Sequence, residues 1–230
     1  MPSILITGCN KGIGLSLVKQ YLGLDWQVYA TARQPQKAHE LLALANDHKN
    51  LQIHTLDVCN AEQRNALAQA LQDITIDILI NNAGIWGQMG SNFTNIDEQK
   101  WLNAFQVNTI APMQMMQTFA ANIAASNIGI IANMSSKMGS IDDNDSGSSY
   151  VYRSSKTALN MVSKSAAIDL QPMGITVIIL HPGWVRTEMG GPQGEINVQQ
   201  SAQRLQKILS AVTPADAGKF YDIDGSVIAW

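Results

Sequence analysis

The chain has 230 residues, of which 46% are hydrophobic and 14% are charged, and its formal net charge is −3. This composition supports one well-packed domain, and it excludes both an intrinsically disordered chain and a general binder of nucleic acid or anionic membranes. The two cysteines, Cys9 and Cys59, are too few for a disulfide framework and are typical of a reducing compartment, so we expect a cytoplasmic protein.

Strands and helices are predicted to alternate along the whole chain. Short apolar runs predict strands at 3–7, 26–31, 51–56, 76–80, 128–134, 175–180 and 219–223. Helical patterns lie between them, at 13–22, 38–46, 62–72, 97–125, 149–171 and 199–212, and Thr94 and Asp97 have the spacing of a capping box before the fourth helix. The strand runs are continuously apolar, which is typical of a parallel sheet covered by helices on both faces. Such a sheet binds ligands at the carboxyl ends of its strands.

The predicted helix at 97–125 carries no membrane signal, although no charged residue occurs between Trp101 and Ser136. Within the predicted helix, Pro112 and six amide side chains interrupt this stretch, namely Asn103, Gln106, Asn108, Gln114, Gln117 and Asn122. A membrane span needs about 20 predominantly apolar residues. We interpret it as a buried or interface helix that leads into a strand. The first residues also lack the basic region of a signal peptide.

A glycine-rich loop follows the first predicted strand. Its residues run from Thr7 to Gly14, with glycines in the spacing G-x-x-x-G-x-G. Glycines here allow a tight turn and a close approach of the backbone to a pyrophosphate, which the N-terminus of the next helix would also attract. The alternative is a glycine-rich turn without a ligand, but the position between a strand and a helix favours a dinucleotide site.

Two cations indicate which dinucleotide. An NAD site usually has an acidic residue after the second strand, to bind the ribose 2′-hydroxyl. Here that strand is followed by Arg33, and Lys11 lies in the glycine loop. These side chains suit a 2′-phosphate, and hence NADP(H). The alternative is that both are ordinary solvated charges.

Tyr152 and Lys156 lie four residues apart, so both side chains share one face of the predicted helix. A cation beside a tyrosine favours the phenolate and would bring its pKa from about 10 toward neutral pH. Such a tyrosine can give a proton to a carbonyl oxygen while hydride reaches the carbon. Ser135 and Ser136 close the preceding strand, and a hydroxyl there could bind the carbonyl, although serines after strands are often only turn formers.

Other chemistries find little support in the sequence. The four histidines have no metal-ligand spacing, the cysteines lie far apart, and no nucleophile has a histidine base nearby in the pattern. His181 is interpreted as a packing residue at a strand end. We therefore expect no metal site and no hydrolase.

Together these segments resemble the short-chain dehydrogenase/reductase family, and most closely its sniffer-type carbonyl reductases and C-factor-like proteins. The matching segments occur in family order and cover nearly the whole chain: 7–14, Asp57-Val58, 81–84, Asn108, Ser136, Tyr152 with Lys156, Pro182-Gly183, and the ending at 220–230. The resemblance implies one Rossmann-type domain over 1–230, a three-layer α/β/α sandwich with a mainly parallel, doubly wound sheet of about seven strands.

The resemblance also implies a role for each matching residue. Tyr152 would be the acid/base, Lys156 would lower its pKa and bind the nicotinamide ribose, and Ser136 would orient the carbonyl. Asn108 would bend the long helix and hold a water of a proton relay. The implied cofactor-binding residues are Gly8, Asn10, Lys11, Gly12, Ile13, Gly14, Arg33, Asp57, Val58, Asn81, Ala83, Gly84, Tyr152, Lys156, Pro182, Gly183, Val185 and Thr187.

Two features depart from the common family pattern. Ser136 and Tyr152 are sixteen residues apart, a few more than usual, which leaves Ser135 as a minor rival to Ser136. The chain also ends soon after the last predicted strand, so the expected substrate lid is the loop and helix at 188–212.

The expected function is NADPH-dependent reduction of an aldehyde, ketone or quinone to an alcohol, with a small-molecule carbonyl substrate and a homodimeric or homotetrameric assembly. The alternative is an NADP(H)-binding signalling or regulatory protein with vestigial turnover. Pure binding needs no Tyr152, so the complete catalytic set favours the reductase.

Overall fold

Seven strands form a single parallel sheet in the computed structural model, which describes all 230 residues. The strand order is β3-β2-β1-β4-β5-β6-β7, and every neighbouring pair is parallel. The strands are β1 (Ser3–Ile6), β2 (Gln27–Ala32), β3 (Leu51–Thr55), β4 (Ile78–Asn81), β5 (Ile130–Met134), β6 (Thr176–Leu180) and β7 (Phe220–Tyr221).

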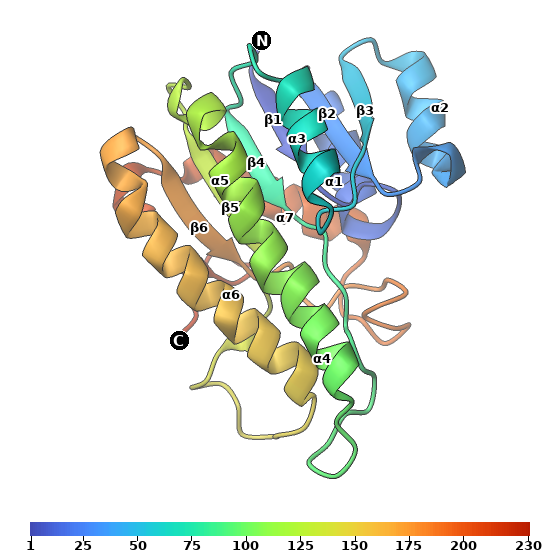
Figure 1. Ribbon diagram of the computed structural model, residues 1–230, viewed down its shortest axis with the longest axis vertical. Coiled ribbons are helices and arrows are strands. Elements are labelled where there is room, and N and C mark those ends of the chain that lie inside the picture. The colour runs from blue at the N-terminus through green and yellow to red at the C-terminus, as the bar shows by residue number, and fades with distance from the viewer.

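Helices cover both faces of this sheet, as the continuously apolar strands require. On one face, a core cluster joins the strands to α1 (Gly12–Leu22), α2 (His39–Asp47) and α7 (Val198–Ala211). On the other face, a second cluster joins them to α3 (Ala61–Ala70), α5 (Ala111–Ala124) and α6 (Tyr150–Asp169). Figure 1 shows α4 (Glu98–Phe105) and α5 following one another in line, with α6 running beside them on this second face. The predicted Rossmann-type three-layer α/β fold is confirmed.

The strand order determines where the sheet has a crevice that can bind a ligand. From β1 the chain runs outward through β2 to β3, then returns to β4 on the other side of β1. The loops that leave β1 and β4 therefore separate toward opposite faces and open a crevice at the carboxyl ends of these strands. The glycine loop follows β1, and residues 82–84 follow β4, so both flank this crevice.

The single helix predicted at 97–125 is interrupted. A π-helical turn, Gln106–Ile110, separates α4 from α5. Pro112 cannot donate a backbone hydrogen bond to the carbonyl one turn earlier, and the Thr109 hydroxyl is drawn to the Ser155 carbonyl of α6 at 2.8 Å. Such π-turns occur often at functional sites, and Asn108 lies inside this one.

The predicted capping box before this helix is wrong. Asp97 itself is the N-cap, and its carboxylate accepts the Lys100 N–H at 3.0 Å. Thr94 instead bonds to the Asn92 side chain, because the preceding loop closes on itself. Other boundaries differ by at most two residues. No helix of the protein combines the length and the apolar character that crossing a bilayer requires.

Candidate active site

A cavity of about 1130 Å³ lies at the carboxyl ends of the strands, and it brings together residues from the segments that follow six of them, β1 to β6. Most of the residues that the sequence predicted for the site line it: Gly8, Asn10, Lys11, Gly12, Ile13, Gly14, Arg33, Asp57, Val58, Ala83, Gly84, Tyr152, Lys156, Pro182 and Thr187. This cavity is large enough for a dinucleotide and a small substrate together.

The glycine loop has the geometry of a phosphate cradle. Gly8 and Gly12 have φ angles of 72° and 62°, which favour glycine, and a Cβ on Gly14 would lie 2.3 Å from the carbonyl oxygen of Gly8. The Asn82 side chain holds the loop by donating to the carbonyls of Thr7 and Gly8 at 2.8 and 3.1 Å. No side chain caps the N-terminus of α1, so its N–H groups are free to bind a pyrophosphate.

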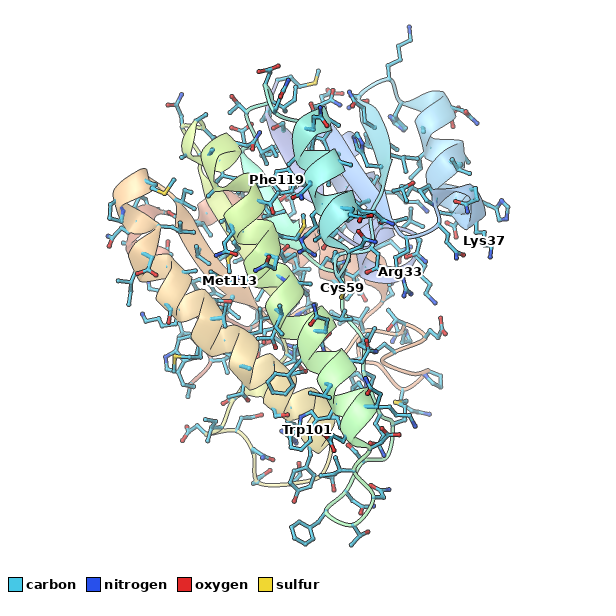
Figure 2. All side chains as sticks on the ribbon, viewed as in Figure 1. Arg33, Lys37, Cys59, Trp101, Met113 and Phe119 are labelled. Carbon is cyan, nitrogen blue, oxygen red and sulfur yellow. The ribbon has the colours of Figure 1, made fainter.

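Besides Lys156, four cations line the cavity: the predicted Lys11 and Arg33, and also Lys37 and Arg186. Arg33 and Lys37 are exposed and come from the segment that follows β2, on one side of the molecule (Figure 2). Lys11 forms an ion pair with Glu188 of the loop after β6. Arg186 is less available, because it donates to the carbonyls of Gly194 and Glu195. Arg33 and Lys37 are therefore the two of these cations that no carboxylate or carbonyl of the protein engages.

Tyr152 and Lys156 are both buried at the floor of the cavity. The ammonium of Lys156 lies 5.7 Å from the centre of the Tyr152 ring and donates to the Met134 carbonyl at 2.8 Å. Burial raises the pKa of Tyr152 to about 12, and a hydrogen bond from Ser136 only partly offsets this effect. Burial also lowers the pKa of Lys156 to about 8.

These pKa values correct one expectation. The sequence predicted that Lys156 would bring the pKa of Tyr152 toward neutral pH, but the pKa is raised. Both groups are buried, and loss of hydration disfavours the charged form of each more than their proximity favours it. Tyr152 is therefore a fully protonated phenol at neutral pH, which is the form that a proton donor needs.

Asn108 lies behind Tyr152 and Lys156 without lining the cavity. Its side chain is buried, accepts the Ile85 N–H at 2.9 Å, and donates to the Ile85 carbonyl and the Ser155 hydroxyl. A Cβ on Gly84 would lie 3.3 Å from Oδ1 of Asn108 and 3.5 Å from Nζ of Lys156. The π-turn thus brings the Asn108 amide close to the Lys156 ammonium, on the same side of Gly84.

Residues 2–197 match the family model of the short chain dehydrogenases. The chain belongs to this family. It is therefore an oxidoreductase, and the resemblance seen in the sequence is confirmed.

Solved carbonyl reductases share the whole fold of this short-chain dehydrogenase. The carbonyl reductase Sniffer of Drosophila melanogaster is 37% identical, with a TM-score of 0.94 and full coverage of both chains. An NADPH-bound carbonyl reductase from chicken fatty liver is 35% identical, with a TM-score of 0.90, and the match covers 100% of this chain and 99% of that one. The C-signal protein of Myxococcus xanthus is 33% identical over 67% of this chain and 93% of its own length.

Some predicted site residues lie outside the cavity. Asn81 is turned into the protein, where its amide donates to Asn133 at 2.8 Å, and its neighbour Asn82 is the residue that contacts the glycine loop. The side chains of Asn81 and Asn82 point in opposite directions because successive side chains of an extended segment alternate between its two faces. Four other predicted residues also do not line the cavity: Asn108, Ser136, Gly183 and Val185.

The two candidate serines have different partners. Ser135 lines the cavity, but its hydroxyl is engaged by the Asn160 side chain at 2.6 Å. Ser136 caps the short helical turn after β5, where its hydroxyl accepts the Met138 N–H at 3.2 Å, and it acts on Tyr152 by lowering the pKa of the phenol. This geometry favours Ser136 as the partner of Tyr152.

His181 at the end of β6 should make the stability of this protein depend on pH. Its Nδ1 is buried without a partner, and burial lowers the pKa to about 4 although Asp222 opposes the shift. An unfolded histidine has a pKa of about 6.5, so the unfolded state takes up the proton first as the pH falls. Stability should be complete above about pH 6.5 and should fall by about 2–3 kcal/mol as the pH approaches 4.

Urea unfolding of the wild type and of His181→Gln, at several pH values between 7.5 and 4.5, measures this effect. The acidic groups that also titrate contribute equally to both proteins, so the difference between the two slopes reports His181 alone. Equal slopes would show that His181 is not the group responsible.

Proposed function

We propose that this short-chain dehydrogenase is an NADPH-dependent carbonyl reductase that converts an aldehyde, ketone or quinone to the corresponding alcohol. The observation that carries the proposal is the meeting of a protonated, buried Tyr152 with Lys156 at the floor of a dinucleotide-sized cavity, with Ser136 acting on Tyr152 from just outside the lining. Carbonyl reductases with the same fold, one of them bound to NADPH, support it.

The cavity residues fit the cofactor. The free N–H groups of α1 and the open glycine loop would bind the pyrophosphate, while Arg33, Lys37 and Lys11 would bind the 2′-phosphate. Asp57 and Val58 would contact adenine, and Ala83 and Gly84 the adenosine ribose. Pro182, Gly183, Val185 and Thr187 would hold the nicotinamide end.

Bound NADPH would supply the hydride. Tyr152 would donate its phenolic proton to the carbonyl oxygen as negative charge develops there, and Ser136 would hold that oxygen by a hydrogen bond. Lys156 would stabilise the resulting phenolate and bind the nicotinamide ribose. Asn108, which lies near Lys156 beside Gly84, would hold a water that returns the proton from solvent.

The substrate lid is proposed to be the loop between β6 and α7. The predicted lid at 188–212 included the helix, but α7 is anchored in the core by Ala202, Leu205 and Leu209. The loop before it is exposed around Glu188 and is held to the glycine loop through the Lys11–Glu188 ion pair. Movement on substrate binding would therefore be confined to this loop.

The test is consumption of NADPH by the purified protein with a panel of aldehydes, ketones and quinones. We expect turnover with at least one member, and a much lower rate with NADH at the same concentration. Tight binding of NADPH without turnover of any carbonyl in the panel would contradict the reductase.

The second candidate is an NADP(H)-binding signalling protein, and the likeness to the C-signal protein of M. xanthus favours keeping it. The two candidates differ in their need for Tyr152. A signalling role that rests on binding alone would survive Tyr152→Phe in cells, whereas a reductase role would be lost with that change.

We also propose a homodimer or homotetramer that associates through the α4–α6 face. Four exposed apolar side chains lie on these helices and the turn between them: Leu102, Ile110, Met161 and Ile168.

Replacing Ile110 by Glu should shift the assembly toward monomer in sedimentation velocity, because a charge would be buried without a partner. Asn65→Glu on exposed α3 is the control and should change nothing; a monomeric wild type would refute the proposal.

A further inference from the structure

The loop that follows β4 holds Trp86 against α6, the helix that carries Tyr152 and Lys156. Both backbone groups of Ile85 are bonded to the Asn108 side chain, and Gln88 bonds to the backbone of Asn95 and Asp97. Between these anchors, Gly87 has a φ of 80°, and a Cβ there would lie 2.6 Å from Val151 of α6. The segment is therefore fixed on both sides of Trp86 and pressed against α6.

The indole of Trp86 stacks on the ring of Tyr152. The ring centres are 4.4 Å apart and the planes are inclined by only 8°. The indole Nε1 is buried and has no hydrogen-bond partner, so the ring is not held in this orientation by a polar contact of its own. What the stack does provide is a flat, water-excluding cover on one face of the phenol.

We propose that Trp86 is a positioning residue for Tyr152, which it holds in the orientation for proton donation and keeps protonated by covering the ring. This inference rests on the proposed function, since it assigns a task within the same proton transfer. The stack restricts rotation of the phenol ring, and with it the direction of the hydroxyl toward Ser136.

The quadrupole of the indole ring also favours the protonated form of Tyr152. The face of an indole carries negative quadrupole charge, which disfavours a phenolate stacked on it, whereas the Lys156 ammonium, the charged group that faces the ring, favours the phenolate. Ser136 faces the phenol from the turn after β5, and residues 82–88 of the loop after β4 include no titratable side chain. The raised pKa of Tyr152 agrees with a cover that excludes water.

The test compares Trp86→Leu and Trp86→Phe with a matched control, Trp101→Leu. Trp101 is also half-buried between α4 and α6, as Figure 2 shows, but its indole donates to Ser154 at 2.8 Å and it stacks on no catalytic ring. Trp86→Leu should lower kcat about ten- to hundredfold, with little change in KM for NADPH. Trp86→Phe should recover most of this loss, and Trp101→Leu should keep the wild-type rate.

The pH dependence separates positioning from a general loss of structure. Without the indole, water reaches the ring, so the pKa of Tyr152 should fall from about 12 toward 10 in Trp86→Leu. Tyrosine labelled with ¹³C at Cζ reports this titration directly by NMR, with the Tyr152 signal assigned by its absence in Tyr152→Phe. This readout needs no turnover, so it stands even if no carbonyl is reduced and the proposed function fails.

Two results would overturn the inference. One is a Tyr152 titration that is the same in the wild type and in Trp86→Leu. The other is an equal loss of rate in Trp86→Leu and Trp101→Leu, with equal losses in melting temperature, which would show that Trp86 only supports the fold.

Discussion

Tyr152→Phe should lower kcat for carbonyl reduction by about two to four orders of magnitude while NADPH still binds. The substitution removes only the hydroxyl, which is the proton donor, and keeps the ring that stacks on Trp86 and faces Lys156. The buried cavity floor offers no other acid at the same place, since Lys156 donates to the Met134 carbonyl and the Ser136 hydroxyl has a far higher pKa than a phenol. Stopped-flow hydride transfer and fluorescence titration of NADPH measure the two effects separately.

Tyr150→Phe is the matched control for this experiment. It removes the same atom from the same helix, two residues away, but Tyr150 is exposed and does not line the cavity. Its rate should equal that of the wild type. If Tyr152→Phe kept a tenth of the activity or more, a different group would have to supply the proton, and the proposed mechanism would be wrong.

Arg33→Ala should raise the KM for NADPH about ten- to hundredfold and leave the KM for NADH nearly unchanged. A hydrogen bond to a charged group contributes about 1.5–3 kcal/mol to binding. NADH has no 2′-phosphate, so its binding does not depend on this bond. Arg33 is free to make this contact, because it forms no ion pair with a carboxylate of the protein.

Two further variants serve as comparisons for Arg33→Ala. Lys37→Ala should have the same selectivity but a smaller effect, since a flexible ammonium makes fewer directed bonds than a guanidinium. Arg204→Ala, on the exposed face of α7 and outside the cavity, should change neither KM. Equal changes for NADPH and NADH in Arg33→Ala would mean that Arg33 does not read the 2′-phosphate.

Glu188 affects how much Lys11 can contribute to the binding of the 2′-phosphate. Its carboxylate pairs with Lys11, and the interaction lowers the pKa of Glu188. A 2′-phosphate would compete with Glu188 for this ammonium, so Lys11 should contribute less to cofactor selectivity than Arg33. The pair is exposed and screened by salt, which limits its strength.

Local patterns predicted most of the fold and the main chemical groups. Continuous apolar runs between helical segments require a parallel sheet covered on both faces, and the strand order then opens a crevice beside the glycine loop. The glycine loop and the Tyr152–Lys156 pair are each contained within one short segment, so their spacing in the sequence is also their spacing in space.

Contacts between distant segments produced the features that the sequence did not predict. Trp86 meets Tyr152 across 66 positions of the chain, and Asn81 turns away from the cavity because Asn133 of the neighbouring strand binds it. The π-turn around Asn108 depends on Ile85 and Ser155, which belong to two other segments. The direction of the Tyr152 pKa shift has the same origin, since burial is set by everything that packs around a side chain, whereas the sequence shows only the charge four residues away.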